Sequence, residues 1–224
     1  MNRAEVIQKI INKIKAKTYL EIGVEYGSTF LKIRAKKKIA VDPSLKISWK
    51  RKIYYLPEIF KMKFYKMTSD EFFARRASIF SKNKIDVAFI DGLHTFEQSL
   101  NDVENCLKYL SQNGVIIMHD CLPASEAAAC PSSLGAKKMN SWQGEWCGDV
   151  WKTIVNLRSQ RDDLNIFVLD TDRGIGIIKR GQAENKLNFS ETEINKMDYN
   201  DFEKNKKEFL NLKPVEYFND FLKV

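Results

Sequence analysis

The sequence predicts an α/β protein with a mostly parallel sheet that ends in an antiparallel hairpin. Between residues 18 and 119, short apolar runs alternate with helical patterns, an order typical of parallel strands joined by crossover helices. Two further apolar runs, at 165–170 and 174–179, flank the tight turn formed by Thr171, Asp172 and Arg173. This second pattern predicts the hairpin, which places one antiparallel strand in the sheet.

The predicted elements follow in order along the chain. Apolar residues at helical spacing predict a lead-in helix over 2–16. We expect seven strands, at 18–24, 38–42, 63–67, 85–91, 115–119, 165–170 and 174–179. Helices are expected at 27–34, after a cap at Ser69, at 96–110 with its end marked by Gly114, and at 150–158.

Three parts of the chain are expected from this order. They are an N-terminal helix at 1–17, a central domain at 18–180 and a C-terminal helical extension at 181–224. Within the central domain, residues 121–148 show no clear period. Long loops inside compact domains tend to be functional, so we expect an active-site loop there.

Length and composition bound the class of protein. The 224 residues, 44% apolar and 29% charged, suit one globular domain with appendages. No apolar run approaches the roughly 20 residues that span a bilayer, and the N-terminus lacks the apolar core of a signal peptide. We therefore expect a cytoplasmic protein without a membrane span, whose four cysteines are reduced thiols.

The net charge is +8, with basic residues concentrated at 36–38 and 46–52. Such a patch could attract nucleic acid, a phosphorylated sugar or a nucleotide-linked substrate. The sequence lacks the regular interleaving of arginine and aromatic residues that marks a nucleic-acid module. The charge pattern therefore favours a solvated surface over a nucleic-acid partner.

The first candidate site follows the first predicted strand, where Glu21, Gly23 and Gly27 lie in LEIGVEYGS. Glycines at a strand end let the backbone turn sharply and approach a ligand. Asp42, 19 residues beyond Gly23, ends the next strand, where a carboxylate can bind ribose hydroxyls. The spacing is G-x-x-x-G and differs from the dinucleotide pattern G-x-G-x-x-G, so a nucleoside without pyrophosphate fits better.

The second candidate site combines Asp91 and His94 with His119 and Asp120. The carboxyl ends of parallel strands meet at one edge of a sheet, so both aspartates are expected to face the pocket of Gly23. Two carboxylates with a histidine could hold Mg²⁺ or Mn²⁺, through Asp91, Asp120 and His119. Alternatively, His94 or His119 acts directly as a general base, or the histidines only make structural hydrogen bonds.

Two other residue types near this site have alternative interpretations. Cys121, Cys130 and Cys147 with a histidine would make four zinc ligands, but the C-x₂₋₄-C spacing of structural zinc sites is absent. The tryptophans in or beside the long loop could stack on an acceptor ring or pack as a lid. They are Trp142, Trp146 and Trp151.

The runs YLEIGVEYGSTF, IAVDPS and VAFIDGLHTFEQSLNDVENCLKYLSQNGVIIMHDC resemble class I S-adenosylmethionine-dependent methyltransferases, especially small-molecule O-methyltransferases. The resemblance spans about residues 18–180 and implies a Rossmann-like three-layer sandwich with S-adenosylmethionine bound at its central domain. By position it implies cofactor contacts from a set of residues in the first half of the chain: Glu21, Gly23, Gly27, Ser28, Asp42, Ser69, Asp70 and Asp91.

The resemblance also implies catalytic residues after the fourth and fifth strands, among Asp91, His94, His119 and Asp120. Metal-dependent members of the catechol O-methyltransferase type carry Asp-Asn or Asp-Asp after the fifth strand. Cys121 stands at the second of these positions, which departs from the metal-binding pattern. The implied acceptor is a small molecule or a saccharide, and the C-terminal helices could form a homodimer.

Two other classes stay open at this point. A nicotinamide-dependent oxidoreductase on a related fold is disfavoured by the missing G-x-G-x-x-G pattern. A non-catalytic RNA-binding protein that retains the fold would bind RNA in a salt-dependent way without binding the cofactor.

Overall fold

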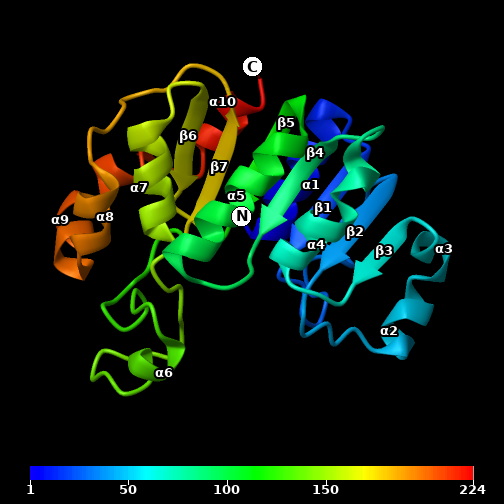
Figure 1. The fold of residues 1–224 in the computed structure, drawn as a ribbon, viewed down its shortest axis with the longest axis horizontal. Helices are drawn as coiled ribbons and strands as arrows, with labels where there is room; N and C mark the ends of the chain where they lie inside the picture. The colour runs from blue at the N-terminus through cyan, green and yellow to red at the C-terminus, as the bar shows by residue number, and fades with distance from the viewer. Residues whose placement is uncertain (224) are drawn as a thin grey trace. The chain divides into compact units, whose positions relative to one another are not determined.

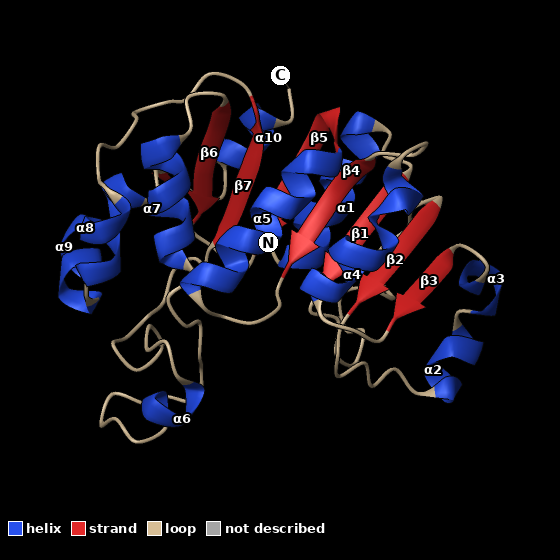
Figure 2. Cartoon of the chain, in the orientation of Figure 1, coloured by secondary structure: helices blue, strands red, loops and turns tan. Residues whose placement is uncertain are grey.

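The structure is a computed structural model that describes residues 1–223, with the side chains of residues 52–54, 56 and 57 outside the description. Figure 1 follows the elements along the chain, and Figure 2 separates helices from strands. The strands are β1 (Thr18–Ile22), β2 (Lys37–Val41), β3 (Met62–Tyr65), β4 (Ile85–Ile90), β5 (Leu110–Met118), β6 (Leu164–Leu169), β7 (Ile175–Arg180) and β8 (Leu212–Lys213). The helices are α1 (Arg3–Ile14), α2 (Trp49–Tyr54), α3 (Leu56–Ile59), α4 (Ser69–Arg76), η1 (Ala77–Phe80), α5 (Phe96–Tyr109), α6 (Ser133–Ala136), α7 (Trp151–Gln160), α8 (Glu191–Lys196), α9 (Tyr199–Phe209) and α10 (Tyr217–Phe221).

The predicted α/β class is confirmed, with one strand more than expected. The hydrogen-bonded strand order is β3-β2-β1-β4-β5-β7-β6-β8. β1 pairs in parallel with β2 and β4, and β2 pairs in parallel with β3. β6 and β7 form the predicted antiparallel hairpin. The eighth strand, β8, has two residues and pairs in parallel with β6, so it was too short to leave a periodic pattern.

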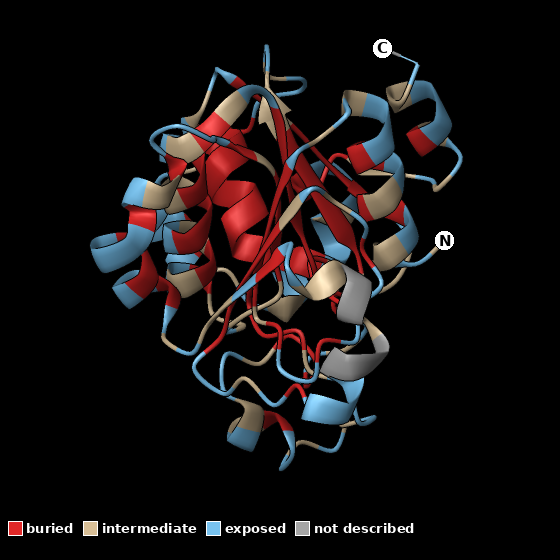
Figure 3. Cartoon of the chain, turned by 90° about the vertical axis from the view of Figure 1, so that its right-hand side faces the viewer, coloured by how far each residue is buried: buried red, intermediate tan, exposed pale blue. Residues whose placement is uncertain are grey.

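The chain divides into two compact units, each described here by itself. The glycine-loop unit comprises residues 2–92 and 101–117, and the hairpin unit comprises residue 1, 93–100 and 118–224. In the glycine-loop unit β1 is buried along its whole length, because a parallel strand is covered on both faces. In the hairpin unit the first four residues of β7 are buried. Figure 3 shows buried residues running along the strands.

Capping explains why several helices begin where they do. Asn2 caps α1 in a capping box: its Oδ1 accepts a hydrogen bond from Glu5 N, and Glu5 Oε2 accepts one from Asn2 N. The α4 helix was expected to be capped at Ser69, but Thr68 is the N-cap and forms a capping box with Glu71. Ser69 is therefore the first helical residue, and the helix begins one position earlier than predicted.

Other expected elements differ in the structure. Residues 27–34 form turns rather than a helix, although Leu31 N still donates to Gly27 O. Gly114 lies inside β5 and does not end α5. A Cβ at Gly114 would lie 2.7 Å from a Leu110 side-chain carbon and 3.1 Å from Ile85 O, so glycine permits close packing there. The segment 43–61, assigned no helix from sequence, contains α2 and α3.

Candidate active site

The glycine loop follows β1 in the glycine-loop unit. Gly23 has φ +84°, and a Cβ there would lie 1.9 Å from the backbone oxygen of Asp91. Gly27 has φ +73°, and its Cβ would lie 2.9 Å from Ile47 Cδ1. Both positions therefore require glycine, because the left-handed backbone and the close neighbours exclude a side chain.

Asp42 holds this loop in place. Its Oδ2 accepts hydrogen bonds from the backbone N–H groups of Val24 (2.8 Å) and Glu25 (2.7 Å). Its Oδ1 accepts from Ser44 N at 2.5 Å. Asp42 directly follows β2, which ends at Val41, and it is buried. Each carboxylate oxygen can accept more than one hydrogen bond, so these contacts leave acceptor capacity for a ligand hydroxyl.

Glu21 lies inside the core of the glycine-loop unit. Tyr19 Oη donates a hydrogen bond to Glu21 Oε2, and the carboxyl is 1% exposed. Burial raises the pKa of Glu21 from 4.5 to about 8, while the Tyr19 hydrogen bond and the Lys38 ammonium act in the opposite direction. Glu21 is therefore largely protonated at neutral pH. It is buried one residue before the end of β1, and its contact with Tyr19 stabilises that strand end.

The remaining predicted cofactor residues of this unit have partners of their own. Asp91 follows β4, and its Oδ2 lies 2.9 Å from Arg3 Nη1 of α1. Asp70 Oδ1 accepts from Asn101 Nδ2 at 2.6 Å. Ser69 is buried, whereas Ser28 is exposed in the glycine loop. The contact from Arg3 has no sequence signal, because it joins residues 88 positions apart.

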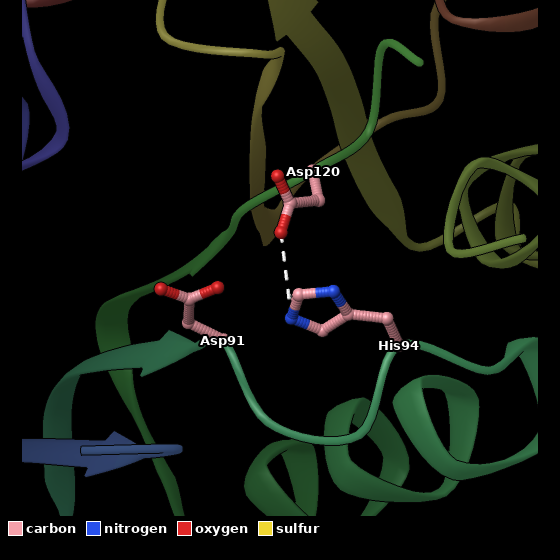
Figure 4. A group of neighbouring side chains, drawn as sticks. All are labelled: Asp91, His94 and Asp120. Carbon is pink, nitrogen blue, oxygen red and sulfur yellow. Dashed lines mark ion pairs between the residues drawn. The ribbon is translucent and has the colours of Figure 1, made fainter. Parts of the chain in front are cut away.

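His94 and Asp120 face one another in the hairpin unit. Figure 4 labels Asp91, His94 and Asp120, and its dashed line joins the last two. His94 Nε2 lies 3.4 Å from Asp120 Oδ2. His94 Nδ1 lies 3.1 Å from the backbone oxygen of Trp146, whose indole stacks on the imidazole with ring centroids 5.0 Å apart. Both ring nitrogens of His94 thus face oxygen acceptors.

Asp120 is the centre of this cluster. It adopts φ 58°, a left-handed conformation, directly after β5. Its Oδ1 lies 3.1 Å from Arg173 Nε and 3.2 Å from His119 Nδ1, and it accepts from Cys147 Sγ at 3.5 Å. Burial and the Asp120 charge raise the pKa of the Cys147 thiol well above its usual range, so this cysteine is a hydrogen-bond donor rather than a nucleophile.

His119 is enclosed. Its side chain is 0% exposed, and its Nε2 lies 3.4 Å from Asp172 Oδ1. With Nδ1 directed at Asp120 and Nε2 at Asp172, both of its nitrogens already face carboxylates. His119 is therefore placed to position Asp120, whereas the His94 side chain, 19% exposed, can reach a ligand.

The loop at 121–148 is more ordered than its sequence suggested. It contains α6, and Trp146 Nε1 donates to Cys130 O at 2.7 Å. Gly148 has φ +64°, and a Cβ there would lie 1.7 Å from His94 O. This loop therefore packs directly against the candidate base.

The tryptophans of this region separate into two roles. Trp146 lies on His94, whereas Trp151 is 1% exposed and packs against Phe202 with ring centroids 4.9 Å apart. Trp151 is thus a core residue and cannot stack on an acceptor.

All four cysteines are free thiols.

The sequence found Asp91, His94, His119 and Asp120 but missed the residues that surround them. Arg173 and Asp172 come from the hairpin turn, where Asp172, Arg173 and Gly174 all have positive φ. The turn itself was predicted. What sequence could not supply was its contact with Asp120 and His119, because the fold brings together segments about 50 residues apart.

Comparison with known proteins indicates the class of protein. Residues 20–121 match the family model of a methyltransferase domain. The chain resembles a cofactor-bound structure from MTB with TM-score 0.60, 11% identity and coverage of 80% of this chain and 81% of that one. No curated protein sequence matches.

Two further structures are similar. An O-methyltransferase from Bacillus cereus solved with S-adenosylhomocysteine gives TM-score 0.53 and 14% identity, covering 80% of this chain and 82% of that one. An O-methyltransferase of tomaymycin synthesis from Streptomyces achromogenes, solved with S-adenosylmethionine, gives TM-score 0.53 and 10% identity, covering 78% of each chain.

The strand order and the glycine loop after β1 define an α/β fold of the Rossmann-like kind, and the chain shares this fold with the similar structures. The family match makes this specific, since residues 20–121 match a methyltransferase domain and support a class I S-adenosylmethionine-dependent methyltransferase. This finding gives no support to the oxidoreductase or the non-catalytic RNA-binding alternative. In the part of the chain that the structure covers, no helix has the length and apolar character to cross a bilayer.

Proposed function

We propose that the protein transfers the methyl group of S-adenosylmethionine to a hydroxyl oxygen of a small molecule or saccharide. One observation carries this proposal: the matched span, residues 20–121, contains every predicted cofactor and catalytic residue, from Glu21 to Asp120. The O-methyltransferase descriptions of the similar structures favour oxygen as the acceptor atom.

In this proposal the glycine-loop unit holds the cofactor. Gly23 and Gly27 let the backbone approach the methionine part, with Ser28 offering an exposed hydroxyl. Asp42 binds the ribose with the acceptor capacity left after its three backbone contacts. Ser69, Asp70 and Asp91 stay predicted contacts, and Glu21 contributes through the strand end that it supports.

The chemical step needs a base. The acceptor oxygen attacks the methyl carbon, the carbon–sulfur bond breaks, and its electron pair stays on sulfur to give S-adenosylhomocysteine. In the proposal the hydroxyl proton passes to neutral His94, whose ring is oriented by Trp146 and Asp120. Asp120, His119 and Arg173 are positioning residues, because Asp120 is buried and the other two hold it.

A divalent cation stays a prediction. Of the two imidazoles, His94 is the better candidate ligand beside Asp120, because both nitrogens of His119 already face carboxylates. When bound, Mg²⁺ or Mn²⁺ would lower the pKa of the acceptor hydroxyl. The contacts of Asp120 disfavour this arrangement, because Arg173 already compensates its charge and His119 and Cys147 contact the same carboxylate oxygen, Oδ1. We also propose that the protein acts in the cytoplasm and that it forms a homodimer.

The test is isothermal titration with S-adenosylhomocysteine after chelator treatment, with and without Mg²⁺ or Mn²⁺. We expect micromolar binding, weakened by Asp42→Ala at least tenfold or about 1.4 kcal/mol, and retained by Asp120→Ala. Absence of binding under every condition would overturn the cofactor assignment. A change in affinity or turnover on adding metal would support the cation, and identical behaviour would remove it.

A further inference from the structure

An exposed aromatic and basic surface lies on the glycine-loop unit, on and beside the loop that carries Gly23 and Gly27. Its aromatic members are Tyr26, Trp49 and Phe60, which are 52%, 66% and 92% exposed. Its basic members are Lys46, Lys50 and Arg51, all exposed. We call these six residues the aromatic-basic surface. Exposed apolar rings rimmed by polar or charged side chains are typical of a surface that binds a partner.

The segment that carries this surface is fixed to the glycine loop. Arg51 Nη1 donates to Tyr26 O at 2.8 Å, and Lys46 N donates to Glu25 O at 2.8 Å. Ile47 is buried against Gly27. The α2 and α3 helices contact each other, and Phe60 directly follows α3. Figure 1 shows α2 and α3 next to β3, at the end of that strand order.

The charge of this segment is mostly positive. Residues 46–61 contain Lys46, Lys50, Arg51, Lys52 and Lys61 against one acidic residue, Glu58. Glu58 pairs with Lys61 at 2.9 Å, and Glu25 of the glycine loop pairs with Lys46 at 3.0 Å. Lys50 and Arg51 therefore leave positive charge beside the exposed Trp49 ring.

We propose that the aromatic-basic surface docks the protein on an anionic lipid membrane. Exposed Trp and Phe rings gain free energy by entering the boundary between headgroups and acyl chains, where tryptophan is enriched. Lysine and arginine near an anionic surface each contribute about 1 kcal/mol. The surface offers both contributions, and neither depends on the proposed methyl transfer.

The positions of the ammonium groups distinguish lipid from nucleic acid. Lys46 Nζ lies 5.1 Å from the centre of the Tyr26 ring, and Lys50 Nζ lies 5.9 Å from that of Trp49. Nucleic-acid bases stack on open ring faces along a basic groove. Here lysines cover the faces, an arrangement that suits rings inserted edge-first with their cations at the headgroups.

The experiment is co-sedimentation of the full chain with phosphatidylcholine vesicles, with and without phosphatidylglycerol, together with tryptophan fluorescence. We expect sedimentation with the anionic vesicles only, weakened by salt, and a blue shift of the emission. Trp49→Phe should keep sedimentation but lose most of the shift, because it removes the inserted indole and keeps an apolar ring.

Charge and ring variants then locate the surface. Lys50→Glu with Arg51→Glu, and separately Trp49→Ser with Phe60→Ser, should each weaken binding at least roughly tenfold. Matched controls are Lys204→Glu with Lys207→Glu, which changes net charge equally, and Leu134→Ser, which removes another exposed apolar side chain. Both controls should bind like the unmodified chain, and circular dichroism checks that each variant folds.

Several results would overturn the proposal. They are no sedimentation with any vesicle, equal binding to phosphatidylcholine alone, or unchanged binding by either surface variant. Tight binding of a single-stranded RNA oligonucleotide without vesicle binding would instead assign the surface to nucleic acid.

Discussion

At the scale of single residues, Glu21 couples folding to pH. Its carboxyl is buried beside Tyr19, and its pKa is raised from 4.5 to about 8. Between these values the folded state holds a proton that the unfolded state has released, so stability falls as pH rises. The stabilisation is complete below pH 4.5 and is lost by about pH 8.

We therefore expect Glu21→Gln to flatten the pH dependence of the free energy of unfolding. The slope that it removes has an upper limit of about 1.4 kcal/mol per pH unit. Urea unfolding at several pH values between 5 and about 7.5 measures this. Burial lowers the pKa of Lys38 to about 8. Lys38 therefore changes the free energy of unfolding only above about pH 8, where it makes stability rise with pH. An unchanged slope in Glu21→Gln would mean that Glu21 is ionised in the core.

His94 is the residue on which the chemical proposal depends. Its side chain is partly exposed and it contacts Asp120 and Trp146. His94→Gln should lower kcat about 10²–10⁴-fold while leaving S-adenosylhomocysteine affinity unchanged. Once an acceptor is known, single-turnover kinetics with titration calorimetry separates the two effects. Full activity in His94→Gln would exclude it as the base.

The sequence indicated candidate site residues at the strand ends but did not distinguish the roles of the two histidines. Strand-end aspartates and histidines are visible in the sequence because they follow apolar runs. Which histidine reaches a ligand depends on burial and on Asp172 and Arg173, residues of a distant turn. His119 and His94 therefore looked equivalent until the fold enclosed one of them.

At the scale of elements, the loop at 121–148 depends on two glycines with different surroundings. Gly148 has φ +64°, and a Cβ added there would lie 1.7 Å from His94 O. Gly144 has φ +89°, and a Cβ added there would have no neighbour within 4 Å. The first position combines backbone strain with a clash, and the second has the strain alone.

Gly144→Ala should therefore cost about 1–2 kcal/mol, the penalty of a left-handed residue. Gly148→Ala should cost more and should also lower turnover, because the loop can relieve the clash only by moving His94. Thermal unfolding and activity of the two variants provide the comparison. Equal effects of both substitutions would show that the loop moves away from His94 freely.

Helices and strands were predictable from sequence where apolar residues form a continuous run or recur at helical spacing. Buried runs placed β1, β2 and β4 within two residues at each end, and the turn at 171–173 placed the hairpin. β5 begins at Leu110 rather than at residue 115. The elements that escaped prediction include α2, α3, α6 and β8. Each of these has six residues or fewer, so its pattern is too brief to show a period.

At the scale of the whole molecule, ligand binding should report whether the two units unfold together. A ligand present at 100 times its Kd stabilises the folded state by about 2.7 kcal/mol. For a chain of this size the corresponding rise in Tm is about 5–10 °C. Differential scanning calorimetry with S-adenosylhomocysteine should show one transition that moves by this amount.

Two transitions, of which only one moves, would instead show that the units unfold separately. In that case the moving transition belongs to the unit with Gly23 and Asp42. Asp42→Ala serves as the control, because it should reduce the ligand-induced shift in either case.

The division of the chain into units also sets an order of events during synthesis. The glycine-loop unit is complete once residue 117 has been made, whereas the hairpin unit then consists of residue 1 and 93–100 alone. Asp120 cannot meet Arg173 until the hairpin turn leaves the ribosome. Under the proposed function, a nascent chain thus acquires the glycine loop that binds the cofactor before the cluster of His94 and Asp120, so the order of translation delays catalytic competence until most of the protein exists.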